Sequence, residues 1–303
     1  FADFVCFQNS GTEATEASIK IARKYFHKIG KPEKNRIITF QGAFHGRTLA
    51  ALFAANNPKH IEGFGPRVDG FDQVPFADHE AVKKAINKNT AAIMVETIMG
   101  EGGIKVVPDF CIKGLRDLCN EHEVLLILDE VQSAYRTGNF FAFENSGIAP
   151  DIVPIAKGIG GGFPLGACLL TKKVSVGMTA GSHGSTFGGN PLAMAVGNAV
   201  LDIIFEKGFL ENVKEKGKYF DQGLNKIKTK YPKIIEEVRG IGLIKGIKML
   251  VDNVEFIKKL MNHKMLTVKA EENVIRLFPP LIVQNQELDE ALNKIEKVCK
   301  EMS

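Results

Sequence analysis

The 303-residue sequence has few of the residues from which metal centres and disulfide frameworks are built. Its five cysteines include no Cys-x-x-Cys pair, and its seven histidines are dispersed along the chain. Zinc sites and disulfide frameworks need closely spaced ligands or paired cysteines, so we expect neither a metal site nor disulfides. Scattered free cysteines favour a reducing compartment, and we therefore expect a cytoplasmic protein.

Long hydrophobic runs are missing as well. No apolar stretch approaches the roughly 20 residues that a membrane-spanning helix needs, and no signal peptide is visible. We therefore expect no membrane partner. The chain begins at Phe1 rather than at a methionine, and Phe1–Phe7 has the alternating pattern of a core strand. Because a domain seldom begins within a strand, we expect further sequence upstream.

Charge of one sign is not in large excess, because 39 Lys and Arg face 35 Asp and Glu, a net charge of +4. The densest basic stretch, Lys214–Lys233, alternates with apolar residues at helical spacing. This pattern predicts the solvated face of a helix, and we expect no nucleic-acid partner. The composition, 45% hydrophobic and 24% charged, is that of a globular protein with room for one large and one small domain.

Up to about Gly208, short β-rich runs alternate with helical patterns. The expected strands are Arg36–Phe40, Ala92–Glu96, Val124–Leu128, Ile152–Ile155 and Ala167–Leu170, and the expected helices are Thr12–His27, Glu80–Ile86, Phe110–His122 and Pro191–Ile204. Continuously apolar strands separated by helices predict an α/β fold whose mainly parallel sheet is covered on both faces.

From about Leu210 the pattern changes to that of an α+β unit. The expected elements are a long amphipathic helix to Tyr231, patterned segments at Glu237–Leu250 and Val254–His263, a short strand at Val274–Phe278 and a final helix over Leu288–Met302. We therefore predict a large domain over residues 1–207 and a small C-terminal domain over residues 208–303.

Lys157 follows the apolar run Ile152–Ala156 and precedes the glycine-rich run Gly158–Gly162. Burying an ammonium group is costly, and we expect desolvation to lower the pKa of this amine. The glycines allow other groups to approach it closely. Such a lysine is suited to attack a carbonyl as a nucleophile. The alternative is a loop lysine beside a flexible turn.

Two loops of hydroxyl residues and glycines precede helices and are suited to bind anions. Ser10–Thr12 lies between the opening strand and the first helix, where backbone N–H groups and two hydroxyls are available. The alternative for this loop is an ordinary helix cap. The second loop, Gly184–Asn190, contains Ser185 and Thr186.

Two strand ends carry side chains where α/β proteins place ligands. Phe44 is suited to stack on a planar ring and Arg47 to hold a carboxylate, although Phe44 is equally compatible with the core. Asp129 ends an apolar strand, where a carboxylate needs a cationic or N–H partner. An aspartate facing a pyridinium nitrogen strengthens an electron sink. The alternative for Asp129 is a structural cap of the following turn.

Arg276 lies between apolar neighbours in Val274–Pro280 and needs a carboxylate partner, from the protein or from a substrate. An arginine on the solvated face of a strand is the alternative. Glu101, in the glycine-rich stretch Gly100–Gly103 just beyond a strand end, is a plausible partner from the protein.

Seven motifs occur in one order along essentially the whole chain. They are Asn9–Ala14, Phe44–Thr48, Gly100–Gly103, Leu128–Gln132, Ala156–Pro164, His183–Pro191 and Arg276–Pro280. Together they resemble the class III, pyridoxal-phosphate-dependent aminotransferases. The ordered set is far more specific than any one motif. The resemblance implies a fold-type I α/β transferase, pyridoxal 5'-phosphate as cofactor, and a homodimer with shared active sites.

The resemblance also implies a role for each candidate residue. Lys157 would bind the cofactor covalently and then carry a proton between cofactor and substrate, and Asp129 would pair with the pyridine nitrogen. The other cofactor-binding residues would be Ser10, Gly11, Thr12, Phe44, Val131, Gln132 and, from the partner subunit, Thr186. The substrate-binding residues would be Arg47, Glu101, Ser185 and Arg276.

The implied reaction moves the terminal amino group of N-acetyl-L-ornithine to 2-oxoglutarate, in arginine biosynthesis. Arg47 would bind the distal carboxylate and Arg276 the α-carboxylate of glutamate, and Glu101 would mask Arg276 in the other half-reaction. Ornithine, succinyldiaminopimelate and 4-aminobutyrate are alternative amino donors. A further alternative is a truncated protein that binds the cofactor without activity.

The chain departs from the family pattern at several points. Family members usually carry a long segment ahead of the position of Asn9. Thr97 stands where proline is usual, and Met99 where glutamine is usual. The loop Ser133–Gly138 is one residue shorter than in the family. These departures leave the cofactor-binding residues in place and bear on substrate binding and activity.

Overall fold

The computed structural model describes all 303 residues, which form two compact units. The first unit comprises Phe1–Thr97, Val107–Ala134 and Phe143–Ile203, and the second comprises Ile98–Val106, Tyr135–Ala142 and Ile204–Ser303. Two short segments that the sequence analysis placed in the large domain are therefore parts of the second unit. The domain boundary between residues 207 and 208 stays a prediction.

The first unit is built on a seven-stranded sheet with the strand order β1-β9-β8-β7-β4-β2-β3. The strands are β1 (Phe4–Gln8), β2 (Arg36–Phe40), β3 (Phe71–Val74), β4 (Thr90–Glu96), β7 (Leu125–Asp129), β8 (Ile152–Ile155) and β9 (Gly166–Leu170). Neighbouring strands from β3 to β8 pair in parallel, whereas β9 runs antiparallel to both β8 and β1. The predicted α/β fold with a mainly parallel sheet is confirmed.

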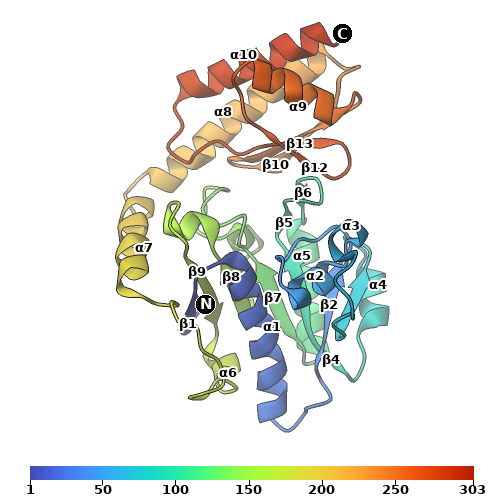
Figure 1. The fold of residues 1–303 in the computed structure, drawn as a ribbon, viewed down its shortest axis with the longest axis vertical. Helices are drawn as coiled ribbons and strands as arrows, with labels where there is room; N and C mark the ends of the chain where they lie inside the picture. The colour runs from blue at the N-terminus through green and yellow to red at the C-terminus, as the bar shows by residue number, and fades with distance from the viewer. The chain divides into compact units, whose positions relative to one another are not determined.

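Helices cover both faces of this sheet (Figure 1). The helices that contact the sheet are α1 (Gly11–Lys28), α2 (Leu49–Ala55), α4 (His79–Ala85) and α5 (Asp109–Glu121). The other helices are α3 (Pro58–Ile61), α6 (Lys172–Ser175) and α7 (Pro191–Ile204), and 3-10 turns lie at Ala142–Ser146 and Lys157–Gly160. In β4, Ala92 and Met94 pack in the core that includes α1, while Val95 lines a cavity with residues of α5. Alternate side chains of one strand thus face opposite layers.

The second unit contains a four-stranded antiparallel sheet in the order β10-β11-β13-β12. Its elements are β5 (Ile98–Met99), β6 (Lys105–Val106), α8 (Phe209–Lys230), β10 (Ile235–Ile241), β11 (Ile244–Met249), α9 (Asn253–Asn262), β12 (Val268–Ala270), β13 (Val274–Leu277) and α10 (Asn285–Glu301). The three long helices lie together against the sheet (Figure 1), where Phe220, Phe256 and Ile295 join Ile247 in one core. A smaller apolar cluster joins β13 to the β5–β6 hairpin through Val274 and Ile104.

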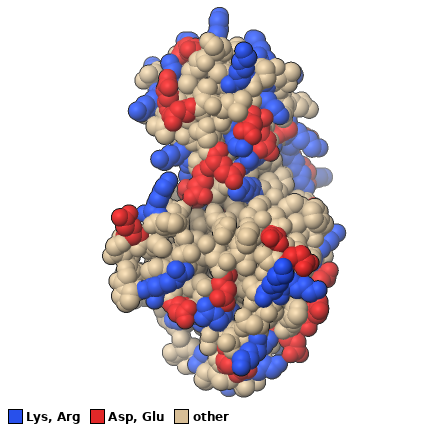
Figure 2. Space-filling model, turned by 90° about the vertical axis from the view of Figure 1, so that its right-hand side faces the viewer, with Lys and Arg blue, Asp and Glu red and all other residues tan.

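Surface charge follows the composition. On the face drawn in Figure 2, Lys and Arg are interspersed with Asp and Glu. Mixed charge of this kind fits the solvated surface that the sequence predicted. No helix is long and apolar enough to cross a membrane.

Candidate active site

Lys157 follows β8 and opens a 3-10 turn in which its own φ is 49°, a left-handed conformation that is uncommon for a residue with a side chain. Its Nζ donates a hydrogen bond to Gln132 Oε1 at 2.5 Å. The sequence analysis expected a buried amine, and this expectation is wrong for the chain, because Lys157 is exposed. The glycines at 158, 161 and 162 are exposed too and supply no side chains to cover it.

Asp129 is the last residue of β7 and is 4% exposed. Both of its carboxylate oxygens are held by the protein. Oδ1 accepts a hydrogen bond from the backbone N–H of Val131 at 3.0 Å, and Oδ2 lies 2.8 Å from Nδ1 of His45. The predicted strand-end carboxylate therefore has N–H partners within the chain, as its burial requires.

His45 is a residue of this site that the sequence analysis did not single out. Its side chain is fully buried, and its second nitrogen, Nε2, has no hydrogen-bond partner. Burial lowers the pKa of His45, but the hydrogen bond and charge of Asp129, together with the charge of Glu96, outweigh burial and raise it overall. His45 lies within the Phe44–Thr48 motif, and its neighbours in that motif were the available signal.

The start of α1 forms the first predicted anion loop. Ser10 is the N-cap residue, and its Oγ accepts a hydrogen bond from the Glu13 N–H. A Cβ added to Gly11 would lie 2.6 Å from Val131 Cγ1, so only glycine allows this close approach. Thr12 Oγ1 accepts a hydrogen bond from the Arg47 N–H at 3.1 Å. The helix start, the Val131 turn and the Arg47 segment therefore meet in one place.

Phe44 and Arg47 lie beside this helix start. The Phe44 N–H donates to Glu96 Oε1 at 2.8 Å, which anchors the segment that follows β2. The Arg47 guanidinium lies over the Phe44 ring, 5.3 Å from its centroid. Arg47 is exposed and forms no ion pair with a carboxylate of the chain. A substrate carboxylate would therefore not have to displace a carboxylate of the protein, since the polar side-chain contact of the guanidinium is with His60 Nε2, at 3.4 Å.

Arg276 and Glu101 form an ion pair within the second unit. Arg276 Nη1 lies 2.9 Å from Glu101 Oε1, and the arginine side chain is 12% exposed against 39% for the glutamate. Arg276 belongs to β13, whereas Glu101 lies between β5 and β6. The Nε of Arg276 is buried without a hydrogen-bond partner. The guanidinium therefore retains a donor that the chain does not use.

The second predicted anion loop lies beside β1. Ser185 Oγ accepts hydrogen bonds from Asn9 Nδ2 at 3.0 Å and from the Gly188 N–H at 3.1 Å. Thr186 is exposed, and Phe187 next to it is 70% exposed. The Ser185 hydroxyl thus holds its own loop, while Thr186 extends outward from it.

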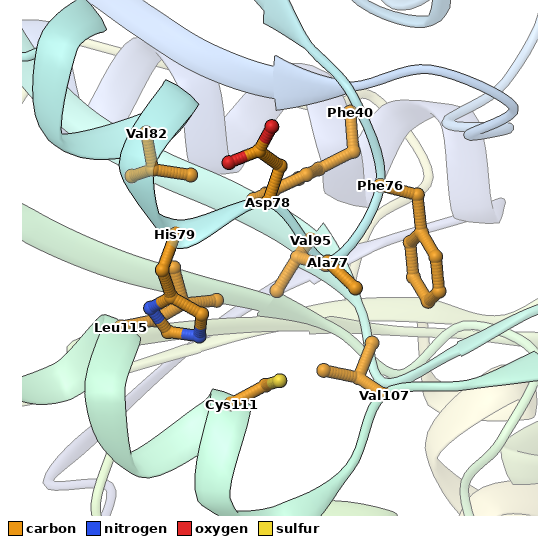
Figure 3. Close-up of a pocket in the computed structure, with 10 residues that line it drawn as sticks. All are labelled: Phe40, Phe76, Ala77, Asp78, His79, Val82, Val95, Val107, Cys111 and Leu115. Atoms are coloured by element: carbon orange, nitrogen blue, oxygen red, sulfur yellow. The ribbon is translucent and has the colours of Figure 1, made fainter.

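A separate cavity of about 10 Å³ lies between the sheet, α4 and α5 (Figure 3). Its lining is largely apolar, with Val95, Val107 and Leu115 drawn around it together with the buried thiol of Cys111. Burial raises the pKa of that thiol. None of the predicted site residues lines this cavity, which has room for about one water molecule. The chain also holds no group of three or more residues suited to bind a metal ion.

Comparison with known proteins identifies the family. Residues 1–299 match the model of the class III aminotransferases, and the chain belongs to this family. It is 55% identical over 304 aligned residues to an acetylornithine aminotransferase of Agrobacterium fabrum, an alignment that covers 100% of the chain and 76% of the relative. A Mesorhizobium japonicum acetylornithine aminotransferase is 56% identical over 301 residues, covering 99% of the chain and 75% of the relative.

Solved structures agree with this assignment. The ornithine aminotransferase of Toxoplasma gondii ME49 matches with a TM-score of 0.94 and 32% identity, over 99% of this chain and 73% of that one. The chain is therefore a pyridoxal-phosphate-dependent aminotransferase with the fold-type I architecture. It spans about three quarters of the length of these curated relatives.

The residues present fit the cofactor. An 18-residue helix that begins beside Ser10–Thr12 offers free N–H groups to a phosphate. Gly11 and Gly46 leave close approaches that a Cβ would fill, at 2.6 Å from Val131 and 2.2 Å from Thr12. Asp129 is a buried carboxylate whose protein partners leave room for a further donor, such as a ring N–H.

Proposed function

We propose that this chain transfers the terminal amino group of N-acetyl-L-ornithine to 2-oxoglutarate, giving N-acetyl-L-glutamate 5-semialdehyde and L-glutamate, in cytoplasmic arginine biosynthesis. The observation that carries the proposal is the Arg276–Glu101 pair, at 2.9 Å, in a chain 55% identical to an acetylornithine aminotransferase. A maskable arginine suits an enzyme that handles one substrate with an α-carboxylate beside the reacting amine and another without it.

Four residues of the first unit would hold and tune the cofactor ring. Pyridoxal phosphate, when bound, supplies an electron sink for the substrate carbanion. Asp129, kept in place by His45 and Val131, would hold the proton on the ring nitrogen through its negative charge. Phe44 and Val131 would pack on opposite faces of the ring.

Lys157 and Gln132 would act at the part of the cofactor where the amino group is transferred. The Lys157 amine would bind the cofactor and then move the proton at the amine-bearing carbon of the substrate. Its hydrogen bond to Gln132 holds the two side chains together. Gln132 would then form a hydrogen bond near the oxygen that the cofactor ring carries. Ser10, Gly11 and Thr12 would hold the phosphate.

Each of the two arginines, Arg47 and Arg276, would bind a different carboxylate of the substrates. Arg47, exposed and without an ion-pair partner, would bind the carboxylate distant from the reacting carbon. Arg276 would bind the α-carboxylate of glutamate once Glu101 has moved away, and Glu101 would neutralise it when acetylornithine is bound. Ser185 would contribute to substrate binding from the loop that it holds.

A homodimer with shared active sites is part of the proposal. Thr186 is exposed in a loop that is hydrogen-bonded at its base, so its hydroxyl is available to a second subunit. Phe187 is 70% exposed and Leu192, at the start of α7, is 62% exposed. Large apolar side chains exposed close together favour a surface that is covered in the assembled protein.

The test is a set of half-reactions with four donors. The protein is loaded with pyridoxal phosphate, and the loss of cofactor absorbance is followed after mixing with acetylornithine, ornithine, succinyldiaminopimelate or 4-aminobutyrate. We expect the highest kcat/KM with acetylornithine. A higher value with ornithine or 4-aminobutyrate would overturn the donor assignment. A bound cofactor that reacts with no donor would favour the inactive, truncated protein instead.

A further inference from the structure

The segment Thr179–Asn190, here called the Thr186 loop, is fastened to β1 and α1 at more than one point. The first point is His183. Its Nδ1 lies 2.8 Å from Lys20 Nζ on α1, and its Nε2 lies 2.9 Å from Nε2 of the Gln8 side-chain amide at the end of β1. One imidazole ring therefore bridges two elements that flank the first anion loop.

Two further attachment points, at Ser185 and Gly188, follow His183 in the sequence. Ser185 Oγ accepts a hydrogen bond from Asn9 Nδ2 at 3.0 Å. Gly188 lies so close to β1 that a Cβ there would be 2.5 Å from the Phe7 carbonyl oxygen. Thr186 lies between these two attachments and is itself exposed. Its position is therefore set by the attachments on either side of it.

The contact with Lys20 determines the protonation state of His183. A lysine ammonium can only donate hydrogen bonds, so His183 Nδ1 must accept. The ring is then neutral with its proton on Nε2. The structure sets the Gln8 amide nitrogen against that N–H, so the bond forms with the amide turned by a half-turn, which brings its oxygen to Nε2 as acceptor. A doubly protonated ring would bring two cations within 2.8 Å of each other.

The surrounding charges keep the ring neutral. Burial and then the charge of Lys20 lower the pKa of His183, and the charge of Glu13 on α1 opposes them without reversing the shift. On β1, the only titratable neighbour in the network is Cys6, whose sulfur is 3.3 Å from the Gln8 amide. The ring is therefore neutral at neutral pH, and its pKa lies below the ordinary histidine value.

We propose that His183 is a positioning residue whose neutral form holds the Thr186 loop against β1 and α1, and that protonation of His183 breaks its contact with Lys20 and loosens the loop, which stays attached at Ser185 and Gly188. This attachment of the loop through His183, here called the His183 latch, involves residues of a single chain only. What Thr186 then contacts, the cofactor phosphate of a second subunit, rests on the proposed function. Loosening of the loop would withdraw that hydroxyl and weaken cofactor binding in acid.

The experiment measures hydrogen exchange of the backbone amides of the Thr186 loop at about pH 7.5 and about pH 5.5, corrected for intrinsic rates, with and without pyridoxal phosphate. In the wild-type protein without cofactor we expect protection to fall about tenfold at the lower pH, the loss of roughly one hydrogen bond. His183→Gln keeps a donor and an acceptor but does not titrate, so its protection should be the same at both pH values.

Two lysine variants give a matched comparison. Lys20→Met removes the bridge and should lower protection at both pH values, whereas Lys24→Met, one turn further along α1, should behave as the wild type. Protection independent of pH in the wild type, or equally pH-dependent in His183→Gln, would overturn the latch.

Cofactor affinity separates the latch from the proposed function. If both hold, the Kd for pyridoxal phosphate rises more steeply in acid for the wild type than for His183→Gln, which retains only the pH dependence common to both proteins. A loop that loosens in acid while affinity follows the same pH course in both proteins keeps the latch and refutes the contact of Thr186 with the cofactor.

Discussion

His45 and Asp129 are joined by a 2.8 Å contact between Nδ1 and Oδ2, and both side chains are almost completely buried. Because His45 Nε2 has no hydrogen-bond partner, the imidazole is committed to a single polar contact. That contact fixes the carboxylate which, in the proposed function, faces the pyridine nitrogen. His45 is therefore a positioning residue that acts on the site through Asp129.

The charge of Asp129 is the first feature to test. Asp129→Asn keeps the shape of the side chain but removes the charge that would hold the ring nitrogen protonated. We expect the rate of amino transfer to fall by orders of magnitude while the protein still binds part of its cofactor. Stopped-flow absorbance measures both quantities. An unchanged rate would mean that Asp129 only stabilises the fold.

The titration of His45 predicts a pH-dependent stability. Its pKa is raised in the folded protein, so the stabilisation is fully present below the unfolded-state pKa of about 6.5 and is lost as pH rises through the higher folded value. His45→Asn keeps an N–H donor near the position of Nδ1 but cannot titrate. Urea unfolding of the cofactor-free protein should show the stability difference between wild type and His45→Asn shrinking above pH 6.5 or so. A difference that is constant or grows with pH would contradict the raised pKa.

The Arg276–Glu101 pair predicts a change in the balance between the two half-reactions. Glu101→Gln leaves Arg276 without its masking charge, so the glutamate half-reaction should gain relative to the acetylornithine one. Arg276→Ala should impair glutamate most. The differential should be about 1–3 kcal/mol, at or below the range expected for truncating one partner of a partly buried charge pair. Separate stopped-flow traces for each donor measure it, and equal effects on both donors would exclude a switch at this pair.

Lys157 should be needed for chemistry rather than for packing, because its side chain is exposed. Lys157→Ala should lose the covalent attachment of pyridoxal phosphate and all turnover while keeping its circular dichroism spectrum. Borohydride reduction followed by mass spectrometry of the peptide that contains residue 157 detects the attachment. Substantial turnover in the alanine variant would remove Lys157 from the proposed mechanism.

Continuous apolar runs predicted the central strands well. The strands Arg36–Phe40 and Ile152–Ile155 and the helix Pro191–Ile204 have the predicted bounds, because each is long or apolar enough to give a clear pattern. β3, whose two middle residues Asp72 and Gln73 are polar, and the two-residue strands β5 and β6 were not predicted, since none of them forms an apolar run long enough to indicate a strand. The segment Glu237–Leu250 forms a hairpin, β10 and β11, whose turn contains Gly242 at a φ of 56°.

The site residues could be predicted where the residue type alone indicates its chemistry. They were harder to predict where the fold determines what surrounds the residue. Arg276 needed a carboxylate, and the chain supplies Glu101. His45 escaped notice because only the packing of the segment after β2 against β7 brings it to Asp129. The exposure of Lys157 depends on how its glycine neighbours fold, which sequence periodicity does not reveal.

The left-handed backbone of Lys157 sets chemistry against stability at one position. A side chain at a φ of 49° carries a backbone cost of about 1 kcal/mol that glycine avoids. Lys157→Gly and Lys157→Ala both lose the amine and its bond to Gln132, so the difference between the two isolates the backbone. We expect the glycine variant to unfold at a higher urea concentration than the alanine variant. A sequence optimised for thermal stability alone would therefore favour glycine here, and in the proposed function it is the need for an amine that retains lysine in this conformation.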